Sequence, residues 1–386
     1  MQSNFIFKMP TKIIFGVNEA LKLDKLLNEL GYKKIFIVTD KFLKEIDAFK
    51  NIVSNLKSKD FDVTVFTDIV PEPPIEVVDN AADVLKNSGA DVVIAVGGGS
   101  TIDICKSICM LKNNEGSVKE YLFGGSKSVV NESLPLIAVP TTAGSGSEVT
   151  AASVISDEQN NIKLSVTHEN LIPKIAVVDP VMHIGMPPLI TASTGMDALT
   201  HAIEAYVSKN ACIISDFYAE KAISLIGENI YTATYTPTDL EARGNMAIAS
   251  ILAAAAFANA GLGAVHGISQ SMGGVAHVPH GVANAMLLPP VIKKNMVGAL
   301  NKFNKVAELL GENIEGLTIR EGAAKAIERI RQMAVDLKIP CSLSEVNVTE
   351  DMFKEIVDGT MGYRLLPLNP VKITENDVYE ILNSLI

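Results

Sequence analysis

The sequence contains no tryptophan, and its four cysteines do not have the paired spacing of a zinc-binding motif. Its most apolar segment, 248–265, is mostly alanine broken by serine, asparagine and glycine, which is typical of a core helix rather than a membrane span. No cluster of lysine and arginine occurs, and the net charge is -11. This charge argues against nucleic acid and anionic membranes as partners. No charged stretch followed by an apolar one stands near Met1, so we expect no signal peptide and a reducing, cytoplasmic location.

The length of 386 residues predicts two domains, and a hydrophobic content of 48% is ample for buried cores. In the first half, short apolar runs rich in β-branched residues alternate with helical stretches such as 75–88. The runs are 35–39, 63–67, 92–96 and 136–139. Strands separated by helices of ten or more residues indicate parallel pairing, so we predict an open α/β sheet.

The pattern changes after Asp179-Pro180, and Met186-Pro187-Pro188 interrupts the chain. From there nearly every segment has helical periodicity. The clearest are 193–207, 216–226, 240–259, 281–295 and 321–337. We therefore predict an α/β domain over residues 1–184 and an all-helical domain over residues 185–386.

A glycine run, Gly97-Gly98-Gly99, joins the 92–96 strand to a following helix. Glycine lets the backbone approach a ligand, and the free N–H groups at a helix start favour an anion, so this loop can cradle a phosphate. The run is not the G-x-G-x-x-G fingerprint, and Ser100 with Asp103 can instead serve as an ordinary helix cap and first-turn acid.

A second loop, 140–148, follows the 136–139 strand and is rich in serine and threonine. Ligands of open parallel sheets bind beyond the carboxyl ends of strands, so two such loops predict a cofactor site. Asp40 closes the 35–39 strand, where a carboxylate can accept from the ribose of NAD and repel the extra phosphate of NADP. The alternative is that Asp40 is only a turn residue.

Asp197 and His201 lie four apart on an expected helix, so both side chains leave the same face. Such a pair can share a metal ion or simply be hydrogen-bonded. His266 and His280 each stand among glycine and small apolar residues, and one carboxylate with three imidazoles suits Fe²⁺ or Zn²⁺. His277, three before His280, is interpreted as a proton relay, with a rival ligand or a donor to a ligand as alternatives.

These motifs, in this order, resemble the iron-containing (group III) alcohol dehydrogenases. The matching stretches cover most of the chain. They are Gly97–Asp103 with Lys106, Pro140–Thr150, Asp179-Pro180, Met186-Pro187, Gly195–Glu204, Gly261–His266, Pro279–Asn284 and Asn369-Pro370. The resemblance implies a dehydroquinate-synthase-like fold of two domains with NAD(P) between them, and Fe²⁺ held by Asp197, His201, His266 and His280.

The resemblance also implies a set of cofactor-binding residues and supports Asp40 as the selector of NAD over NADP. The set is Asp40, Gly97, Gly98, Gly99, Ser100, Asp103, Thr141, Thr142, Ser145, Ser147 and Lys163.

The sequence departs from the family pattern near the expected substrate pocket. Gln270 stands where many relatives carry a further histidine, four residues after His266. Pro71-Glu72-Pro73 replaces the usual Pro-Asn-Pro of a nucleotide contact. Arg364 precedes the terminal Asn-Pro, where a guanidinium can pair with a sulfonate, phosphonate or carboxylate, or can form a surface salt bridge.

We therefore expect a metal-dependent, NAD(H)-using alcohol dehydrogenase or aldehyde reductase that acts on a short-chain aldehyde. An aldehyde with an anionic tail, such as sulfoacetaldehyde, is the specific hypothesis. The alternatives are a simple alcohol or diol dehydrogenase of the 1-propanol, 1,3-propanediol or butanol type, a dehydroquinate-synthase-like lyase, and a binding module without catalysis. The resemblance further implies a homo-oligomer, a dimer or larger.

Overall fold

The computed structural model describes residues 4–70, 73–157 and 162–386, which form two compact units. The sheet unit comprises residues 9–142 and 146–186. The helical unit comprises residues 187–386 together with the N-terminal segment up to Lys8 and the short segment 143–145.

The sheet unit is built on a six-stranded parallel sheet in the order β1-β8-β5-β4-β2-β3. The strands are β1 (Lys12–Phe15), β2 (Lys34–Val38), β3 (Asp62–Phe66), β4 (Val92–Gly97), β5 (Leu136–Pro140) and β8 (Ile175–Val178). Between β5 and β8 the chain forms an antiparallel hairpin of β6 (Ala152–Asp157) and β7 (Ile162–Thr167). The four strands expected from apolar runs correspond to β2, β3, β4 and β5. β1, β8 and the hairpin were not expected.

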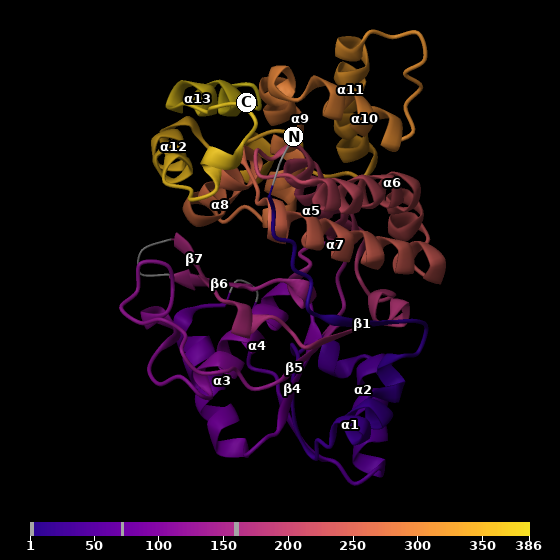
Figure 1. The fold of residues 1–386 in the computed structure, drawn as a ribbon, viewed down its shortest axis with the longest axis vertical. Helices are drawn as coiled ribbons and strands as arrows, with labels where there is room; N and C mark the ends of the chain where they lie inside the picture. Colours follow the sequence, from indigo (N-terminus) through magenta and orange to yellow (C-terminus); the bar gives the residue numbers. More distant parts are fainter. Residues whose placement is uncertain (1–3, 71–72, 158–161) are drawn as a thin grey trace. The chain divides into compact units, whose positions relative to one another are not determined.

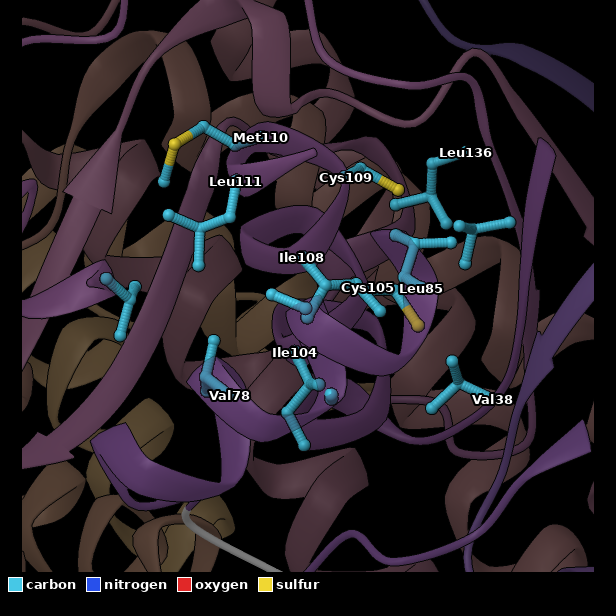
Figure 2. Packing of buried hydrophobic residues seen from close by; sticks show 14 of the residues in the cluster. Val38, Val78, Leu85, Ile104, Cys105, Ile108, Cys109, Met110, Leu111 and Leu136 are labelled. Atoms are coloured by element: carbon cyan, nitrogen blue, oxygen red, sulfur yellow. The ribbon is translucent and has the colours of Figure 1, made fainter. Parts of the chain in front are cut away.

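Helices cover both faces of the sheet (Figure 1). They are α1 (Leu23–Leu30), α2 (Asp47–Ser58), α3 (Ile75–Ser88) and α4 (Gly99–Leu111). Alternate residues of each strand point to opposite faces, so Ile94 packs with α1 and α2, while Val93 packs with α3 and α4. Figure 2 shows the second of these cores, in which Cys105 and Cys109 are buried among Leu85, Ile108 and other apolar side chains of the cluster. Apolar side chains of the helices therefore cover both faces of the sheet, as is usual for a parallel sheet.

The register of the central strands places the two expected cofactor loops next to each other. β4 pairs with β5 as far as Gly97 opposite Pro140, and each strand ends there. The backbone N–H of Thr141 then donates to the carbonyl of Gly97 (3.1 Å). The glycine loop and the hydroxyl-rich loop thus begin side by side at the carboxyl edge of the sheet, where ligands of such sheets bind.

The helical unit contains no strand among its described residues. Its helices are α5 (Pro188–Val207), α6 (Ile213–Tyr235), α7 (Leu240–Ala260), α8 (Ala264–Ala276), α9 (His280–Asn295), α10 (Leu300–Leu309), α11 (Ile319–Asp336), α12 (Phe353–Met361) and α13 (Glu375–Asn383). α5 contacts α6, α7 and α9, and nearly every residue from Thr191 to Val207 is buried. The expected helices over 193–207, 216–226, 240–259, 281–295 and 321–337 correspond to α5, α6, α7, α9 and α11.

Close packing around α5 depends on small side chains. A Cβ on Gly195 would approach the side chains of Ile230 and Met246 to 2.9 Å, so glycine lets α6 and α7 lie close to α5 at this level. The alanine-rich 248–265 segment is divided between α7 and α8, which meet at a bend of 102°. Among the described residues, no single helix is both long and apolar enough to cross a membrane, and only this bent pair, taken together, passes that test.

Candidate active site

Four side chains of the helical unit converge on one carboxylate oxygen. Asp197 and His201 come from consecutive turns of α5, His266 from the first turn of α8, and His280 from the first residue of α9. The distances from Asp197 Oδ1 to the Nε2 atoms of His201, His266 and His280 are 3.9, 3.8 and 3.7 Å. Asp197, His201 and His266 are buried, and the side chain of His280 is 33% exposed. Three helices thus bring together the residues expected to hold a metal ion.

The donor set fits a divalent cation. Ligand atoms bonded to one ion at about 2.1 Å lie roughly 3.0–3.5 Å apart, so the distances of 3.7–3.9 Å from Asp197 Oδ1 to the three Nε2 atoms must shorten by less than about 1 Å when an ion binds. The ligand atoms of Asp197, His201 and His266 lie within 4.8 Å of one another. Burial lowers the pKa of His201 to about 4, in spite of the opposing charge of Asp197, so its imidazole is neutral at pH 7 and can donate a lone pair to an ion.

The negative charge of Asp197 also favours binding of a cation. Burial acts to raise the pKa of Asp197, but the neighbouring imidazoles, His201 foremost, and the hydrogen bond from Asn284 together hold this pKa below its ordinary value. Asp197 is therefore a carboxylate at neutral pH. One anionic oxygen among imidazole nitrogens is a ligand set that suits Fe²⁺ and Zn²⁺.

Two acceptors behind the imidazoles fix their tautomers. Glu204 Oε2 lies 2.6 Å from Nδ1 of His266, and the backbone carbonyl of Gly144 lies 3.3 Å from Nδ1 of His201. In each ring the proton therefore belongs on Nδ1, and the lone pair on Nε2 faces Asp197. Glu204 Oε1 also accepts from the backbone N–H of Val265 (2.7 Å), which fixes the start of α8.

Sequence reasoning missed both acceptors as parts of the site. Glu204 stands three residues after His201 on α5, so its position one turn further along the same helix was a usable signal. Gly144 offered no signal, because its contribution is a backbone carbonyl 57 residues away from His201. A Cβ on Gly144 would lie 2.6 Å from the carbonyl oxygen of Thr194, so glycine is needed for this segment to pack against α5.

Aromatic rings enclose His201. Its ring stacks on Phe257 of α7, with centroids 4.4 Å apart, and on His266, with centroids 4.6 Å apart. These two stacking contacts restrict rotation of the imidazole, so His201 is held in a ligating orientation by packing as well as by its hydrogen bond.

In the sheet unit, the glycine loop leads into the N-terminus of α4. Gly98 is the N-cap residue and provides no side-chain cap, and Gly99 and Ser100 form the first turn. The N–H groups at the start of this helix are thus suited to a phosphate. Thr142 lies beside Gly98, where a Cβ on the glycine would approach the threonine side chain to 3.1 Å.

Asp103 faces the protein rather than open space. Its Oδ1 accepts from Ser147 Oγ and lies 3.3 Å from Lys106 Nζ, and its Oδ2 accepts from the backbone N–H of Val154 (3.0 Å). The side chain of Lys106 is fully buried. Its ammonium group also donates to Ser147 Oγ (2.7 Å), Thr150 Oγ1 (3.2 Å) and the backbone carbonyl of Ala152 (2.7 Å). This network ties α4 to the hydroxyl-rich loop, so Asp103 and Ser147 hold the loop in shape.

Asp40 has the turn geometry considered as its alternative role. Its Oδ1 accepts from the backbone N–H groups of Phe42 (2.8 Å) and Leu43 (2.7 Å). Lys163 is in β7, opposite Ser156 of the hairpin. Ser145 lies in the segment that belongs to the helical unit. Pro71 and Glu72 of the altered Pro-Glu-Pro motif lie outside the described residues.

Of the residues expected at the substrate pocket, Gln270 lies within α8, and His277 and Arg364 lie at or just beyond helix ends in the helical unit. Gln270 is half-buried on α8, one turn after His266, and His277 is exposed at the C-terminus of α8 with a left-handed backbone (φ 53°). Arg364 is exposed just beyond the end of α12. The preceding residue, Tyr363, lies against Gly267, where an added Cβ would be 3.1 Å from its ring. This contact brings the C-terminal segment close to the start of α8.

A parallel-sheet unit with a phosphate-type loop, combined with a helical unit carrying an aspartate and three histidines, defines a class of metal-dependent dinucleotide enzymes. Two family models match the chain: iron-containing alcohol dehydrogenase over residues 10–180, and the C-terminal model of the Fe-containing alcohol dehydrogenase family over residues 191–386. The chain therefore belongs to the iron-containing alcohol dehydrogenase family, which confirms the expected family, fold class and oxidoreductase class.

Curated relatives and a solved structure of a similar protein match this chain over nearly its full length. The chain is 37% identical over 382 residues to 1,3-propanediol dehydrogenase of Citrobacter freundii, covering 98% of each chain. It is 35% identical over 378 residues to NAD-dependent methanol dehydrogenase of Bacillus methanolicus, covering 98% of this chain and 99% of that one. A structure of sulfoacetaldehyde reductase from Bifidobacterium kashiwanohense in complex with NAD⁺ superposes with a TM-score of 0.90 at 30% identity, covering 99% of this chain and 98% of that one.

Proposed function

We propose that the protein catalyses reversible hydride transfer between NADH and a short-chain aldehyde, with Fe²⁺ or Zn²⁺ held by Asp197, His201, His266 and His280. The observation that carries this proposal is the convergence of three imidazole Nε2 atoms within 3.9 Å of one buried carboxylate oxygen. Bound there, a divalent ion supplies Lewis acidity toward a carbonyl or alcohol oxygen, and the nicotinamide supplies or accepts the hydride.

The protein's own groups would bind and orient the reactants. In the proposed division of the chain, residues 1–184 bind NAD(H), with the pyrophosphate at the N-terminus of α4 beside Gly97, Gly98, Gly99 and Ser100. Thr141, Thr142, Ser145 and Lys163 would contact the nicotinamide ribose. Residues 185–386 hold the ion.

Asp40 is proposed to favour NAD over NADP. Its Oδ1 is engaged in the turn, and its negative charge remains to repel a 2′-phosphate. His277 is proposed to relay the proton to the alkoxide oxygen of the product, and its exposure at the end of α8 leaves the imidazole accessible to water.

For the substrate we propose a short aldehyde with an anionic tail such as a sulfonate, bound with the help of Arg364 and lined by Gln270. Two observations support this: Arg364 is exposed on the segment that follows α12, and a relative in the family is a sulfoacetaldehyde reductase. A simple alcohol or diol is the second candidate, favoured by the similarity to methanol and 1,3-propanediol dehydrogenases. Family membership favours both over the lyase alternative and over binding without catalysis.

The experiment is to remove metal, restore Fe²⁺ or Zn²⁺, and follow NADH oxidation with acetaldehyde, propionaldehyde and sulfoacetaldehyde. The Asp197→Ala protein should lose both stoichiometric metal and turnover, whereas full retention of metal would refute the ligand set. Arg364→Ala should reduce kcat/KM for sulfoacetaldehyde selectively, with Lys372→Ala, an exposed cation on the same segment, as the matched control. Equal effects on charged and neutral aldehydes would leave the simple-aldehyde candidate.

We further propose a cytoplasmic location and assembly as a homo-oligomer, a dimer or larger, with neither nucleic acid nor membrane as a partner. The buried free thiols of Cys105, Cys109 and Cys212 suit a reducing compartment, and the net charge of -11 disfavours polyanionic partners. Sedimentation velocity of the purified protein tests the assembly.

A further inference from the structure

One side-chain amide touches three of the four proposed ligands. Asn284 lies on α9, one turn after His280, and is fully buried. Its Nδ2 donates to Asp197 Oδ1 (2.6 Å) and lies 3.1 Å from His280 Nε2 and 3.3 Å from His266 Nε2. These are the atoms that face one another in the proposed metal site.

The orientation of this amide is fixed by its surroundings. The three neighbouring atoms are a carboxylate oxygen and two ring nitrogens, and the lone pair of an amide oxygen would be repelled by the carboxylate. The nitrogen therefore points at the ligands. As a result, Asn284 Oδ1 is buried and has no hydrogen-bond partner among the described residues. An unpartnered buried oxygen is uncommon in folded proteins, and here it follows from turning the amino group toward the ligand atoms.

We propose that Asn284 is a positioning residue: its amino group holds Asp197, His266 and His280 in a ligating arrangement and thereby raises the affinity for the divalent ion. The inference rests on the proposed metal site and adds to it a residue that is not one of the four ligands. Without a donor among them, a carboxylate and two imidazole lone pairs repel one another, and this repulsion works against the contact with Glu204 that holds His266 in place. An amide that keeps them together reduces the ordering that metal binding requires.

Two other roles for Asn284 make different predictions. If its hydrogen bond to Asp197 only joined α9 to α5, substitution would lower the stability of the metal-free protein and leave metal affinity unchanged. If its amino group chiefly competed with the ion for the same acceptors, substitution would tighten metal binding. Metal affinity therefore separates the three roles, and it is measured without reference to turnover.

The test compares the wild-type protein with Asn284→Ala and Asn284→Leu, each stripped of metal and folded as judged by circular dichroism. Leucine has the branching and the number of side-chain heavy atoms of asparagine, is larger in volume and lacks the donor, so a defect caused by a cavity is confined to the alanine variant. Zn²⁺ affinity is measured by competition with a chromophoric chelator, the visible spectrum of the Co²⁺-loaded protein reports ligand geometry, and thermal unfolding of the metal-free protein reports stability.

The matched control is Asn114→Ala. Asn114 is also a buried asparagine, its amide bonds to Met110 and Asn131, and it lies in the sheet unit. We expect both Asn284 variants to bind Zn²⁺ about 10–100-fold more weakly and to show an altered Co²⁺ spectrum, whereas Asn114→Ala loses stability and keeps wild-type affinity. Unchanged or tighter binding by the Asn284→Leu protein would overturn the proposal. Absence of stoichiometric binding by the wild-type protein would instead refute the metal site itself.

Discussion

Replacing Glu204 by glutamine should weaken metal binding although Glu204 is not a proposed ligand. The carboxylate accepts two hydrogen bonds, from His266 Nδ1 (2.6 Å) and from the backbone N–H of Val265 (2.7 Å). Glutamine has nearly the same shape but only one acceptor oxygen, so its amino group must face one of these two donors. Whichever way the amide turns, His266 loses the anionic partner that holds its proton on Nδ1 and makes Nε2 a better ligand.

The size of the effect follows from the bond that is lost. A hydrogen bond to a charged group is worth about 1.5–3 kcal/mol, and a buried donor left unpaired costs about 1–3 kcal/mol. If the whole energy of this charged hydrogen bond is lost from metal binding, metal affinity falls about 10- to 150-fold. The cost of the unpaired donor should lower the unfolding free energy of the metal-free protein, because Glu204, Val265 and His266 are all buried.

The assay is Zn²⁺ competition with a chromophoric chelator, together with urea unfolding of the metal-free protein. Glu220→Gln is the matched control, because Glu220 accepts one hydrogen bond, from the hydroxyl of Tyr206 (2.6 Å), and a glutamine oxygen can still accept it. The control should keep wild-type metal affinity. If Glu204→Gln binds Zn²⁺ as tightly as the control does, the tautomer argument is refuted.

Three further predictions concern the sheet unit. Lys106→Met should lower the unfolding free energy by about 3–5 kcal/mol and weaken NADH binding, because Asp103 loses its buried cation. Urea unfolding and NADH fluorescence titration measure the two effects, and no change in either would contradict this prediction. Burial raises the pKa of Glu148 to about 7, so the folded state holds its proton more tightly than the unfolded chain. This contribution to stability is complete below about pH 4.5 and is lost as the pH rises through 7. The unfolding free energy should therefore fall by about 3 kcal/mol between pH 4.5 and 8, and Glu148→Gln should remove this fall. An unaltered pH profile of unfolding in the variant would disprove this. Asp40→Asn keeps an acceptor for the turn and removes the charge, so kcat/KM for NADPH relative to NADH should rise at least about fivefold, and an unchanged ratio would mean that Asp40 is only a turn residue.

The main elements of the fold were accessible from local patterns. The segment 75–88 was expected as a helix and is α3, bounded by Pro74 and by a left-handed Gly89. β8, a run of four apolar residues like the predicted 136–139 strand, was missed because no α-helix lies among the described residues between β5 and β8, so it does not continue the alternation of strands and helices. β1 was missed because it is a short edge strand with partly exposed side chains, so its sequence lacks the apolar run of a central strand. α8 was missed because it consists mostly of small residues and is largely buried, which leaves little amphipathic pattern.

The proposed ligands were accessible from the sequence, whereas their supporting residues gave only the weak signal of a position one helical turn after a ligand. Asp197 and His201 reveal themselves through spacing on one helix, and imidazole is a side chain with recognisable metal chemistry. The spacing of Glu204 from His201 and of Asn284 from His280 does not show which other ligand each of them contacts. Glu204 meets His266 across 62 residues of sequence, and Asn284 meets Asp197 across 87. Glutamate and asparagine are common residues with many roles, so only the packing of α5 against α8 and α9 reveals these contacts.

The positions of these residues suggest why one family can act on different alcohols. The proposed ligands lie within helices or at their first turns, and buried partners such as Glu204 hold them. His277 and Arg364, by contrast, are exposed at the end of α8 and just beyond the end of α12. Substitutions at exposed helix ends cost little stability, whereas a change among the buried partners alters ligand geometry. We therefore expect substrate preference to vary through exposed residues such as Arg364, while Glu204 and Asn284 keep the ion and its reactivity constant.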